Sequence, residues 1–266
     1  MKPFFRIPKI IPFFFIAILA VFSAGCGEKT PESLPGPEMK LLFVGNSYTF
    51  VNNLPGTVAQ LAASGRHRLS ADLAAPGGWT LAQHANSKET LDKISGKKWD
   101  FVVLQDQSVM PSLERERTEE MYPAVRYLAA RINQAGAAPL LYMTWGRQRG
   151  LTEVGFPDYG SMQAQLSFGY GEIAKELSLR MAPVGEAWKN ALEKDPALGL
   201  WQADGSHPSG AGTYLAACVF YAALYRESPE GLSFTGGLSK GEARALQAVA
   251  AGTVLTDPGR WNIPEK

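Results

Sequence analysis

Two short motifs near opposite ends of the sequence carry side chains suited to nucleophilic chemistry. Residues 45–49 (GNSYT) follow the apolar run 41–44, and residues 204–208 (DGSHP) lie far downstream. A serine hydroxyl is a weak nucleophile until a base removes its proton, and the base needs an acid to orient it. If the fold brings them together, Ser47, His207 and Asp204 supply the minimum set of groups for acyl transfer through serine.

The chain around these motifs alternates apolar runs of strand length with longer segments of helical periodicity. We expect strands at 40–44, 69–73, 101–104, 139–143 and 181–184. We expect helices where apolar residues recur at helical spacing, at 54–64, 81–94, 115–135, 161–179, 209–225 and 240–251. Three of the strand runs are apolar almost throughout, which is typical of strands covered on both faces. The alternation therefore favours one α/β domain with a central parallel sheet and helices on both sides.

The polar and glycine-rich loops of this pattern follow the expected strands. In an open parallel sheet, ligands bind beyond the carboxyl ends of the strands, near the switch in strand order. Ser47 follows the first strand, Gly77-Gly78 the second, residues 105–108 (QDQS) the third and residues 144–147 (TWGR) the fourth. We expect these loops to converge at one edge of the sheet, with the 204–208 loop closing over it.

Together these motifs resemble those of the SGNH (GDSL-like) hydrolases, a superfamily of serine esterases, over residues 39–225. Residues 45–47 are similar to the first block, with Asn46 where many members have aspartate. Residues 78–80 (GWT) are similar to the second block, and residues 204–207 match the Asp-x-x-His block. The resemblance implies a flavodoxin-like three-layer α/β fold with a central, mostly parallel five-stranded sheet and helices on both faces.

The resemblance also implies catalytic roles. Ser47 would be the nucleophile, His207 the base and Asp204 the acid that holds the imidazole tautomer. No metal or organic cofactor is needed for this chemistry. Backbone N–H groups of Ser47 and Gly78 would bind the oxyanion of the tetrahedral intermediate, and losing one such donor typically costs about 3 kcal/mol.

The third block departs from the family pattern. Members typically carry Gly-x-Asn-Asp after the third strand, and the asparagine is an oxyanion donor. Residues 105–108 read Gln-Asp-Gln-Ser instead. Gln107 aligns with the asparagine and offers the same amide N–H₂ from one more methylene away, while Gln105 is the other candidate. The departure indicates a divergent member of the family.

Aromatic and basic side chains lie on or near the same loops. Trp79, Trp145 and Trp201 are either core residues or flat platforms for sugar rings. Arg147 and Arg149 are either solvated charges or partners for the carboxylate of an acidic sugar. We keep Trp79, Trp145 and Arg147 as candidate substrate-binding residues.

The first 25 residues have the pattern of a secretory signal peptide. Three basic residues precede an apolar stretch, and the small residues that end it stop at Cys26. Ser-Ala-Gly-Cys resembles a bacterial lipobox, in which the cysteine is lipidated and becomes the mature N-terminus. Residues 26–38 are rich in Pro, Gly, Glu, Lys and Ser, which is typical of a flexible tether. We therefore expect a single folded domain at 39–266, exported across the inner membrane and anchored by lipid in the cell envelope, in the periplasm or outer membrane.

The net charge and the cysteine content argue against several classes of partner and cofactor. The whole chain has 26 basic and 25 acidic residues, and loss of Lys2, Arg6 and Lys9 with the signal peptide leaves a net charge of −2. This charge argues against a nucleic-acid partner. Cys218 lies in an apolar run and is expected to be a small buried hydrophobe, and no cysteine–histidine cluster has zinc spacing. The sequence leaves the oligomeric state open.

Some residues of reactive type are expected to be structural. Residues 237–241 (GLSKG) fit a Gly-x-Ser-x-Gly pattern, but no buried strand precedes them and no histidine follows, so we expect Ser239 to cap the last helix. We assign no role to His67. We expect His84 on a helix surface, with the rim of the site as its alternative place.

These observations predict a secreted serine esterase that removes a small acyl group, acetyl first of all, from a carbohydrate or related extracellular ester. A thioesterase or lysophospholipase would use the same triad, and the preferred acyl chain length separates the two. A third interpretation is a glycan-binding lipoprotein that has lost catalysis. It stays open because residues 105–108 depart from the family pattern. A nucleotide- or flavin-binding protein is disfavoured, because residues 45–49 contain one glycine and no lysine of the P-loop kind.

Overall fold

The computed structural model describes residues 1, 3 and 36–265. Contacts divide the chain into Met1–Ser33 and Leu34–Lys266, and every described helix and strand belongs to the second unit. The expected signal peptide, Cys26 and the tether up to residue 35 lie outside the described residues. The first strand begins at Glu38, one residue before the expected start of the domain.

The five expected strands form one sheet, and all neighbouring strands run parallel. The strands are β1 (Glu38–Val44), β2 (Arg68–Ala74), β3 (Phe101–Leu104), β4 (Ala138–Tyr142) and β5 (Arg180–Ala182). Their order is β2-β1-β3-β4-β5. This is the flavodoxin-like order, and its switch point lies between β1 and β3. The predicted fold class is confirmed.

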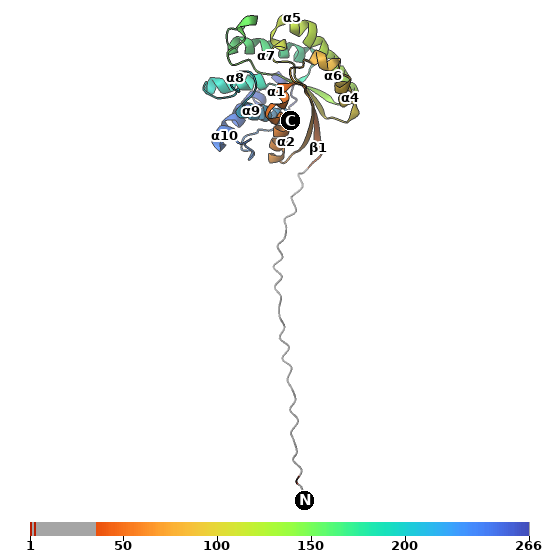
Figure 1. The fold of residues 1–266 in the computed structure, drawn as a ribbon, viewed down its shortest axis with the longest axis vertical. Helices are drawn as coiled ribbons and strands as arrows, with labels where there is room; N and C mark the ends of the chain where they lie inside the picture. Colours follow the sequence, from red (N-terminus) through yellow and green to blue (C-terminus); the bar gives the residue numbers. More distant parts are fainter. Residues whose placement is uncertain (2, 4–35, 266) are drawn as a thin grey trace. The chain divides into compact units, whose positions relative to one another are not determined.

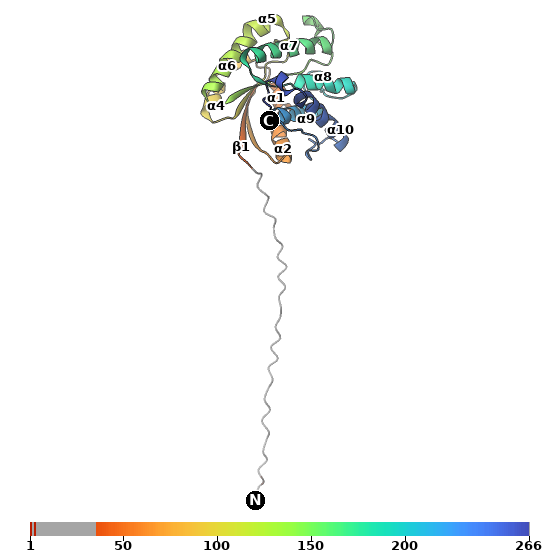
Figure 2. The same cartoon turned by 180° about the vertical axis from the view of Figure 1, so that it is seen from behind.

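Helices cover both faces of the sheet (Figures 1 and 2). On one side, α9 packs against α2 and α10, and α8 packs against α9 and α10. On the other side, α6 packs against α3, α4 and α7. The bounds on the first side are α2 (Leu54–Ser64), α8 (Val184–Lys194), α9 (Gly210–Tyr225) and α10 (Lys240–Leu255). Those on the second are α3 (Leu81–Ala85), α4 (Lys88–Gly96), α6 (Tyr122–Gln134) and α7 (Tyr159–Leu177).

Burial on both faces explains the continuous apolar runs. All four residues of 41–44 have no exposed surface, and the same is true of the last three residues of β3. Helix α9 is buried along almost its whole length, because the sheet, α2 and α10 surround it. Its Phe220 packs edge-on against Phe43 of β1 and Tyr142 of β4, with ring centroids 5.4 and 5.0 Å apart. Cys218 is fully buried in the same helix, as predicted.

Two predicted helices are interrupted. The segment 81–94 forms α3 and α4, because Ser87 accepts a hydrogen bond from the Thr90 N–H and starts a new helix. The segment 115–135 forms α5 (Glu114–Glu116), a π-helical turn (Arg117–Met121) and α6. Pro123 lies in the first turn of α6 and has no N–H to donate, which accounts for the irregular turn before it.

Other helix ends follow their capping residues. Ser209 and Ser239 accept hydrogen bonds at the starts of α9 and α10, so the expected caps are confirmed. Helix α8 is not predicted by the sequence pattern, because its first residue, Val184, continues the apolar run of β5. Among the described residues, no helix has the length and apolar character to cross a membrane.

Candidate active site

Ser47 stands at the sharp turn between β1 and the one-turn helix α1 (Ser47–Phe50). A Cβ atom at Gly45 would collide with the Gln105 side chain, so the turn requires glycine there. Asn46 caps α1, and its Oδ1 accepts a hydrogen bond from the Tyr48 N–H at 3.1 Å. As the first residue of a helix, Ser47 has a backbone N–H without an intrahelical acceptor. Its hydroxyl and its N–H therefore both lie at the carboxyl edge of the sheet.

The structure brings Ser47, His207 and Asp204 into one hydrogen-bonded chain. The Ser47 Oγ lies 2.9 Å from His207 Nε2, and His207 Nδ1 lies 2.5 Å from Asp204 Oδ2. An ionised carboxylate only accepts hydrogen bonds, so Nδ1 carries the hydrogen and Nε2 is left to accept from the Ser47 hydroxyl. This is the arrangement in which an imidazole can remove a serine proton.

The loop 204–207 is built around the Asp204 carboxylate. Its Oδ1 accepts the backbone N–H groups of Ser206 and His207 at 2.9 and 3.0 Å. The hydrogen bond from His207, and then that from the Ser206 N–H, lowers the pKa of Asp204 to about 2. The carboxylate therefore stays ionised at neutral pH, which keeps the imidazole in one tautomer.

Two further contacts tie the serine turn to the histidine loop. The Tyr48 hydroxyl lies 2.7 Å from Ser206 Oγ, and Asn52 Nδ2 donates to the Pro208 carbonyl at 2.8 Å. Asn52 has a positive φ of 54°. The sequence reasoning missed these positioning residues, since short polar side chains in turns give no pattern that separates them from other turn formers.

Asn46 joins the loops after β1, β2 and β3. Its Nδ2 donates to the Trp79 carbonyl at 2.8 Å, while its Oδ1 accepts from Gln105 Nε2 at 3.0 Å. Its backbone N–H donates to Gln105 Oε1 at 2.9 Å. An aspartate could not donate to the Trp79 carbonyl, which gives a physical reason for asparagine at this place in the first block.

The two glutamines after β3 differ in what their amides contact. Gln105 is fully buried, and its Nε2 donates to Asn46 Oδ1 and to the Asp106 carbonyl. Gln107 is half-buried, and its Oε1 accepts the Val109 N–H at 2.8 Å. No described residue accepts a hydrogen bond from Gln107 Nε2. Of the two amides, only that of Gln107 has its donor group available.

Gly78 lies in an exposed turn after β2 with a φ of +74°, which favours glycine. Within the described part of the chain, its backbone N–H has no hydrogen-bond acceptor. The Ser47 and Gly78 N–H groups thus remain available to a ligand at this edge, together with the amide of Gln107.

The tryptophans predicted as platforms lie at different depths. The prediction for Trp145 is wrong, because this side chain is fully buried, stacks between Tyr48 and Trp188, and donates its Nε1–H to the Ser206 carbonyl. Trp145 supports the histidine loop from below and offers no face to a ligand. Trp79 is half-buried and directly follows Gly78. Trp201 is half-buried, and its Nε1 donates to the Gly146 carbonyl.

His84 and Asp106 are buried polar residues behind the site. The expected surface position of His84 is wrong, because it is fully buried between the Gly45 carbonyl (2.8 Å) and Thr90 Oγ1 (2.9 Å). Burial is the largest cause that lowers its pKa, so the ring stays neutral. Asp106 Oδ1 accepts the N–H groups of Leu81 and Gln107, and burial raises its pKa to about 6.

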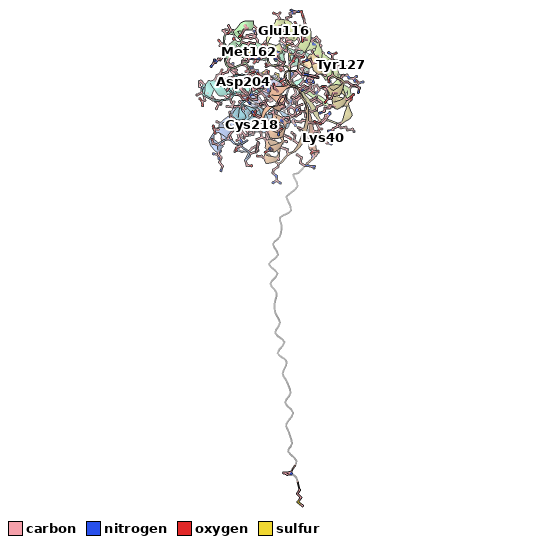
Figure 3. The ribbon with its side chains drawn as sticks, viewed as in Figure 1. Lys40, Glu116, Tyr127, Met162, Asp204 and Cys218 are labelled. Atoms are coloured by element: carbon pink, nitrogen blue, oxygen red, sulfur yellow. The ribbon has the colours of Figure 1, made fainter. Side chains whose placement is uncertain are left out.

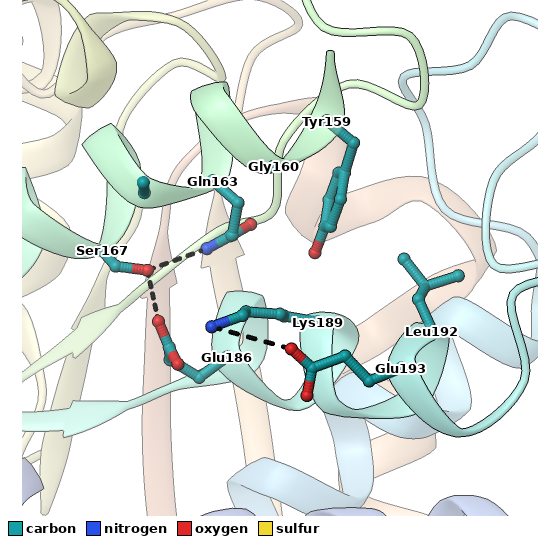
Figure 4. A pocket seen from close by; sticks show the side chains of 9 residues that line it. Tyr159, Gly160, Gln163, Ser167, Glu186, Lys189, Leu192 and Glu193 are labelled. Atoms are coloured by element: carbon teal, nitrogen blue, oxygen red, sulfur yellow. Dashed lines mark hydrogen bonds and ion pairs between the residues drawn. The ribbon is translucent and has the colours of Figure 1, made fainter.

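Two cavities lie near the loops after β4. One, of about 320 Å³, is lined by Arg147, Arg149 and Asp204 among others, so Arg147 lies on the same cavity as Asp204. The other, of about 310 Å³, lies between α7 and α8, and Figure 4 shows Ser167 bridging Gln163 and Glu186 there. Among the described residues, no group of three His, Cys, Asp or Glu side chains is placed to hold a metal ion.

Comparison with known proteins decides the family. No protein-family model and no curated protein matches the chain. A solved structure of an SGNH hydrolase from Slackia heliotrinireducens matches with 30% sequence identity and a TM-score of 0.60, over 70% of this chain and 98% of that one. The chain belongs to the SGNH hydrolases. As a member of this family it is a hydrolase of ester bonds.

Two more distant structures share the SGNH fold. A DUF4886 family protein from Bacteroides uniformis matches with a TM-score of 0.72 and 18% identity, over 82% of this chain and 95% of that one. A mutant form of an acetyl-xylooligosaccharide esterase from Geobacillus Stearmophilus matches with a TM-score of 0.53 and 17% identity, over 76% of this chain and 97% of that one.

Proposed function

We propose that this SGNH hydrolase is a serine esterase in which Ser47, His207 and Asp204 form the catalytic triad. The observation that carries the proposal is the continuous hydrogen-bonded chain from Ser47 Oγ through the imidazole to Asp204 Oδ2. In this chain the carboxylate is ionised and the Nε2 atom can accept the serine proton.

The mechanism has two acyl-transfer steps. Ser47 Oγ attacks the ester carbonyl carbon while His207 Nε2 takes its proton, and the carbonyl oxygen becomes an oxyanion. Collapse of this intermediate breaks the bond to the alcohol, which leaves with the proton from Nε2, and forms the acyl-serine. Water then attacks the acyl-serine, again losing its proton to Nε2, and the acid leaves as Ser47 regains its hydrogen.

The oxyanion in both steps needs donors that are fixed before the reaction. The N–H groups of Ser47 and Gly78 and the Nε2 group of Gln107 are available for this role. Gly78 is held near the serine turn because Asn46 binds the carbonyl of the next residue, Trp79. Because such donors do not reorganise during the reaction, they stabilise the transition state more than water does.

The proposed substrate is a carbohydrate or related extracellular ester that carries a small acyl group, and the proposed acyl group is acetyl. The half-buried Trp79 beside Gly78 can pack its ring against a sugar. An acetyl-xylooligosaccharide esterase shares the fold, which supports the proposal by analogy.

Acyl chain length tests this choice. We expect kcat/KM for p-nitrophenyl esters to be highest for acetate and to fall steadily toward the decanoate and palmitate. A preference for long chains, or for acyl thioesters over acetate, would instead identify a thioesterase or lysophospholipase with the same triad. The Ser47→Ala variant provides the background rate in each assay.

We propose further that the chain is exported through its N-terminal signal and held in the cell envelope by lipid on Cys26. This proposal rests on the sequence pattern of residues 1–38 alone. It gives the enzyme access to extracellular glycan esters, with the 26–38 tether between the anchor and the catalytic domain.

A further inference from the structure

Two arginines, Arg147 and Arg149, line the cavity beside Asp204. It has a volume of about 320 Å³ and is formed by residues 147–153, which follow β4, and residues 203–205. Among the described residues, no carboxylate lies within ion-pair distance of Arg147 or Arg149. The Nε atom of Arg147 is enclosed and has no hydrogen-bond partner in the described part of the chain. Because Nε has no exposed surface, a ligand in the cavity would meet the Nη groups of Arg147, which have no hydrogen-bond partner among the described residues and are not enclosed.

The wall that bears these arginines is held in place by backbone contacts. The Gln148 N–H donates to the Gly205 carbonyl at 2.9 Å, which joins the two sides of the cavity. Gly150 has a φ of +72°, and a Cβ atom there would collide with the Phe156 carbonyl. Leu151 and Phe156 close the loop by an isolated antiparallel bridge.

The arginine loop is also fixed from behind. Arg147 donates its backbone N–H to the sulfur of Met162 at 3.3 Å, and both Met162 and Asp204 are labelled in Figure 3. Gly146, the preceding residue, is held by Gln163 through its N–H and by Trp201 through its carbonyl, at 2.9 and 3.1 Å. The guanidinium groups therefore extend from a rigid support.

The cavity adjoins the proposed triad through Asp204. Asp204 lines it and also binds His207. The positive charge of Arg147 reaches Tyr48, the neighbour of Ser47: burial raises the pKa of the Tyr48 hydroxyl most strongly, and Arg147 acts against that rise. A substrate whose ester carbonyl reaches Ser47 can thus place a second group in the cavity.

We propose that this cavity is a subsite for a carboxylate on the alcohol side of the ester, so that the preferred substrates are O-acylated acidic sugars. The planar guanidinium of Arg147 offers paired N–H donors that match a carboxylate. The cavity lining also contains two carboxylates, Glu153 and Asp204, and Asp204 Oδ2 is hydrogen-bonded to His207. Because the two arginines are balanced by these two carboxylates, a singly charged carboxylate is repelled less than a doubly charged phosphate, and the subsite suits the carboxylate better.

This inference rests on the proposed esterase function, and a matched pair of substrates tests it. Methyl 3-O-acetyl-glucuronide and methyl 3-O-acetyl-glucoside differ only in a carboxylate or a hydroxymethyl group at one carbon. We expect the wild-type enzyme to show a kcat/KM roughly tenfold higher for the glucuronide, because a charged hydrogen bond is worth about that factor. Salt should reduce the preference, since it screens the charges.

Variants of the cavity residues test whether the preference for the glucuronide arises from the arginines. Arg147→Ala should bring the glucuronide-to-glucoside ratio close to one, and Arg149→Ala should lower it partly. Arg147→Lys keeps the positive charge but loses the paired N–H donors of the guanidinium, so we expect an intermediate glucuronide-to-glucoside ratio. Arg131→Ala is the matched control, because Arg131 is an exposed arginine on α6 whose side chain contacts Gln134 instead. The ratio is measured within each variant, so a general loss of activity cancels.

The outcomes separate the inference from the proposed function. Wild-type hydrolysis of p-nitrophenyl acetate that depends on Ser47, combined with equal rates on the two sugars, would overturn the carboxylate subsite and leave the esterase function intact. A higher rate on the matching 6-sulfate than on the glucuronide would also contradict the carboxylate assignment. Loss of all Ser47-dependent hydrolysis would overturn the esterase function and the subsite together.

Discussion

Gln107 and Gln105 are two residues apart, yet the structure gives their amides different surroundings. Gln105 holds the serine turn, with its Oε1 accepting both the Asn46 N–H and the Thr49 hydroxyl at 2.9 Å. Gln107 presents an Nε2 group that no described residue accepts. This difference follows from side-chain direction on an irregular loop, and residue type and register alone could not establish it from the sequence.

The pair gives a test of the oxyanion donor. We expect Gln107→Ala to lower kcat by about 100-fold with little change in the free energy of unfolding, because it removes a donor from the transition state. We expect Gln105→Ala to lower the unfolding free energy, because it strips buried hydrogen bonds from the serine turn. Steady-state kinetics and urea unfolding of both variants check this. A larger kcat loss in Gln105→Ala, at unchanged stability, would move the oxyanion role to Gln105.

Asp106 gives a prediction about pH and stability. Burial raises its pKa from 3.8 to about 6, so the unfolded chain releases this proton at a lower pH than the folded chain does. The stabilisation of the fold by the protonated Asp106 carboxyl is therefore fully present below pH 3.8, and it is lost as the pH rises through 6. Relative to Asp106→Asn, the wild type should lose about 2 kcal/mol of unfolding free energy between pH 4 and pH 7.

Asparagine is a close control for this effect, because its Oδ1 can still accept the N–H groups of Leu81 and Gln107. Urea unfolding of both proteins at the two pH values gives the difference, and the other carboxylates cancel in the comparison. Parallel pH dependence of the two proteins would show that Asp106 ionises normally in the folded state.

At the scale of elements, the sheet positions the site and the loops after β1, β2 and β3 complete it. Asn46 links the three loops through the Trp79 carbonyl and the Gln105 amide. We expect Asn46→Asp to weaken this link, because a carboxylate oxygen would face the Trp79 carbonyl and the loop that carries Gly78 would be released. The measured effect should be a kcat loss of roughly tenfold and a lower unfolding free energy, by about 1–3 kcal/mol.

Asn46→Ser is the companion variant, because it retains helix capping without adding a charge. If repulsion matters, Asn46→Asp should be the less stable of the two at neutral pH. Equal stability of the two variants would contradict the repulsion argument and leave only the loss of the amide donor.

The regular elements were predictable where one physical signal dominates. Strand runs such as 41–44 and 101–104 are apolar on both faces, so their place in a parallel sheet follows from composition. The break at Ser87 and the irregular turn before Pro123 were not predicted, because apolar periodicity continues across both. The triad was predictable from motif order, whereas the depth of Trp145 and His84 depends on packing between elements that are distant in the chain.

At the scale of the whole molecule, the N-terminal segment can be tested separately from the folded domain. The sequence pattern of residues 1–38 predicts export of the chain, lipidation of Cys26 and a flexible tether at residues 26–38. In a bacterial host, the full chain should fractionate with membranes, and Cys26→Ser should move it to the soluble periplasmic fraction with unchanged specific activity. Cys218→Ser is the matched control, since Cys218 is buried in α9. Equal partitioning of wild type and Cys26→Ser would contradict the lipid anchor.

The central claim is that Ser47 is the nucleophile, and covalent labelling tests it most directly. The protein from Met39 onward is treated with a fluorophosphonate probe, and the adduct is located by peptide mass spectrometry. We predict a single phosphonylated peptide containing Ser47, with no labelling in Ser47→Ala, strongly slowed labelling in His207→Ala and normal labelling in Ser239→Ala. A folded wild-type protein that stays unlabelled, or one that is labelled equally after loss of Ser47, would contradict the account.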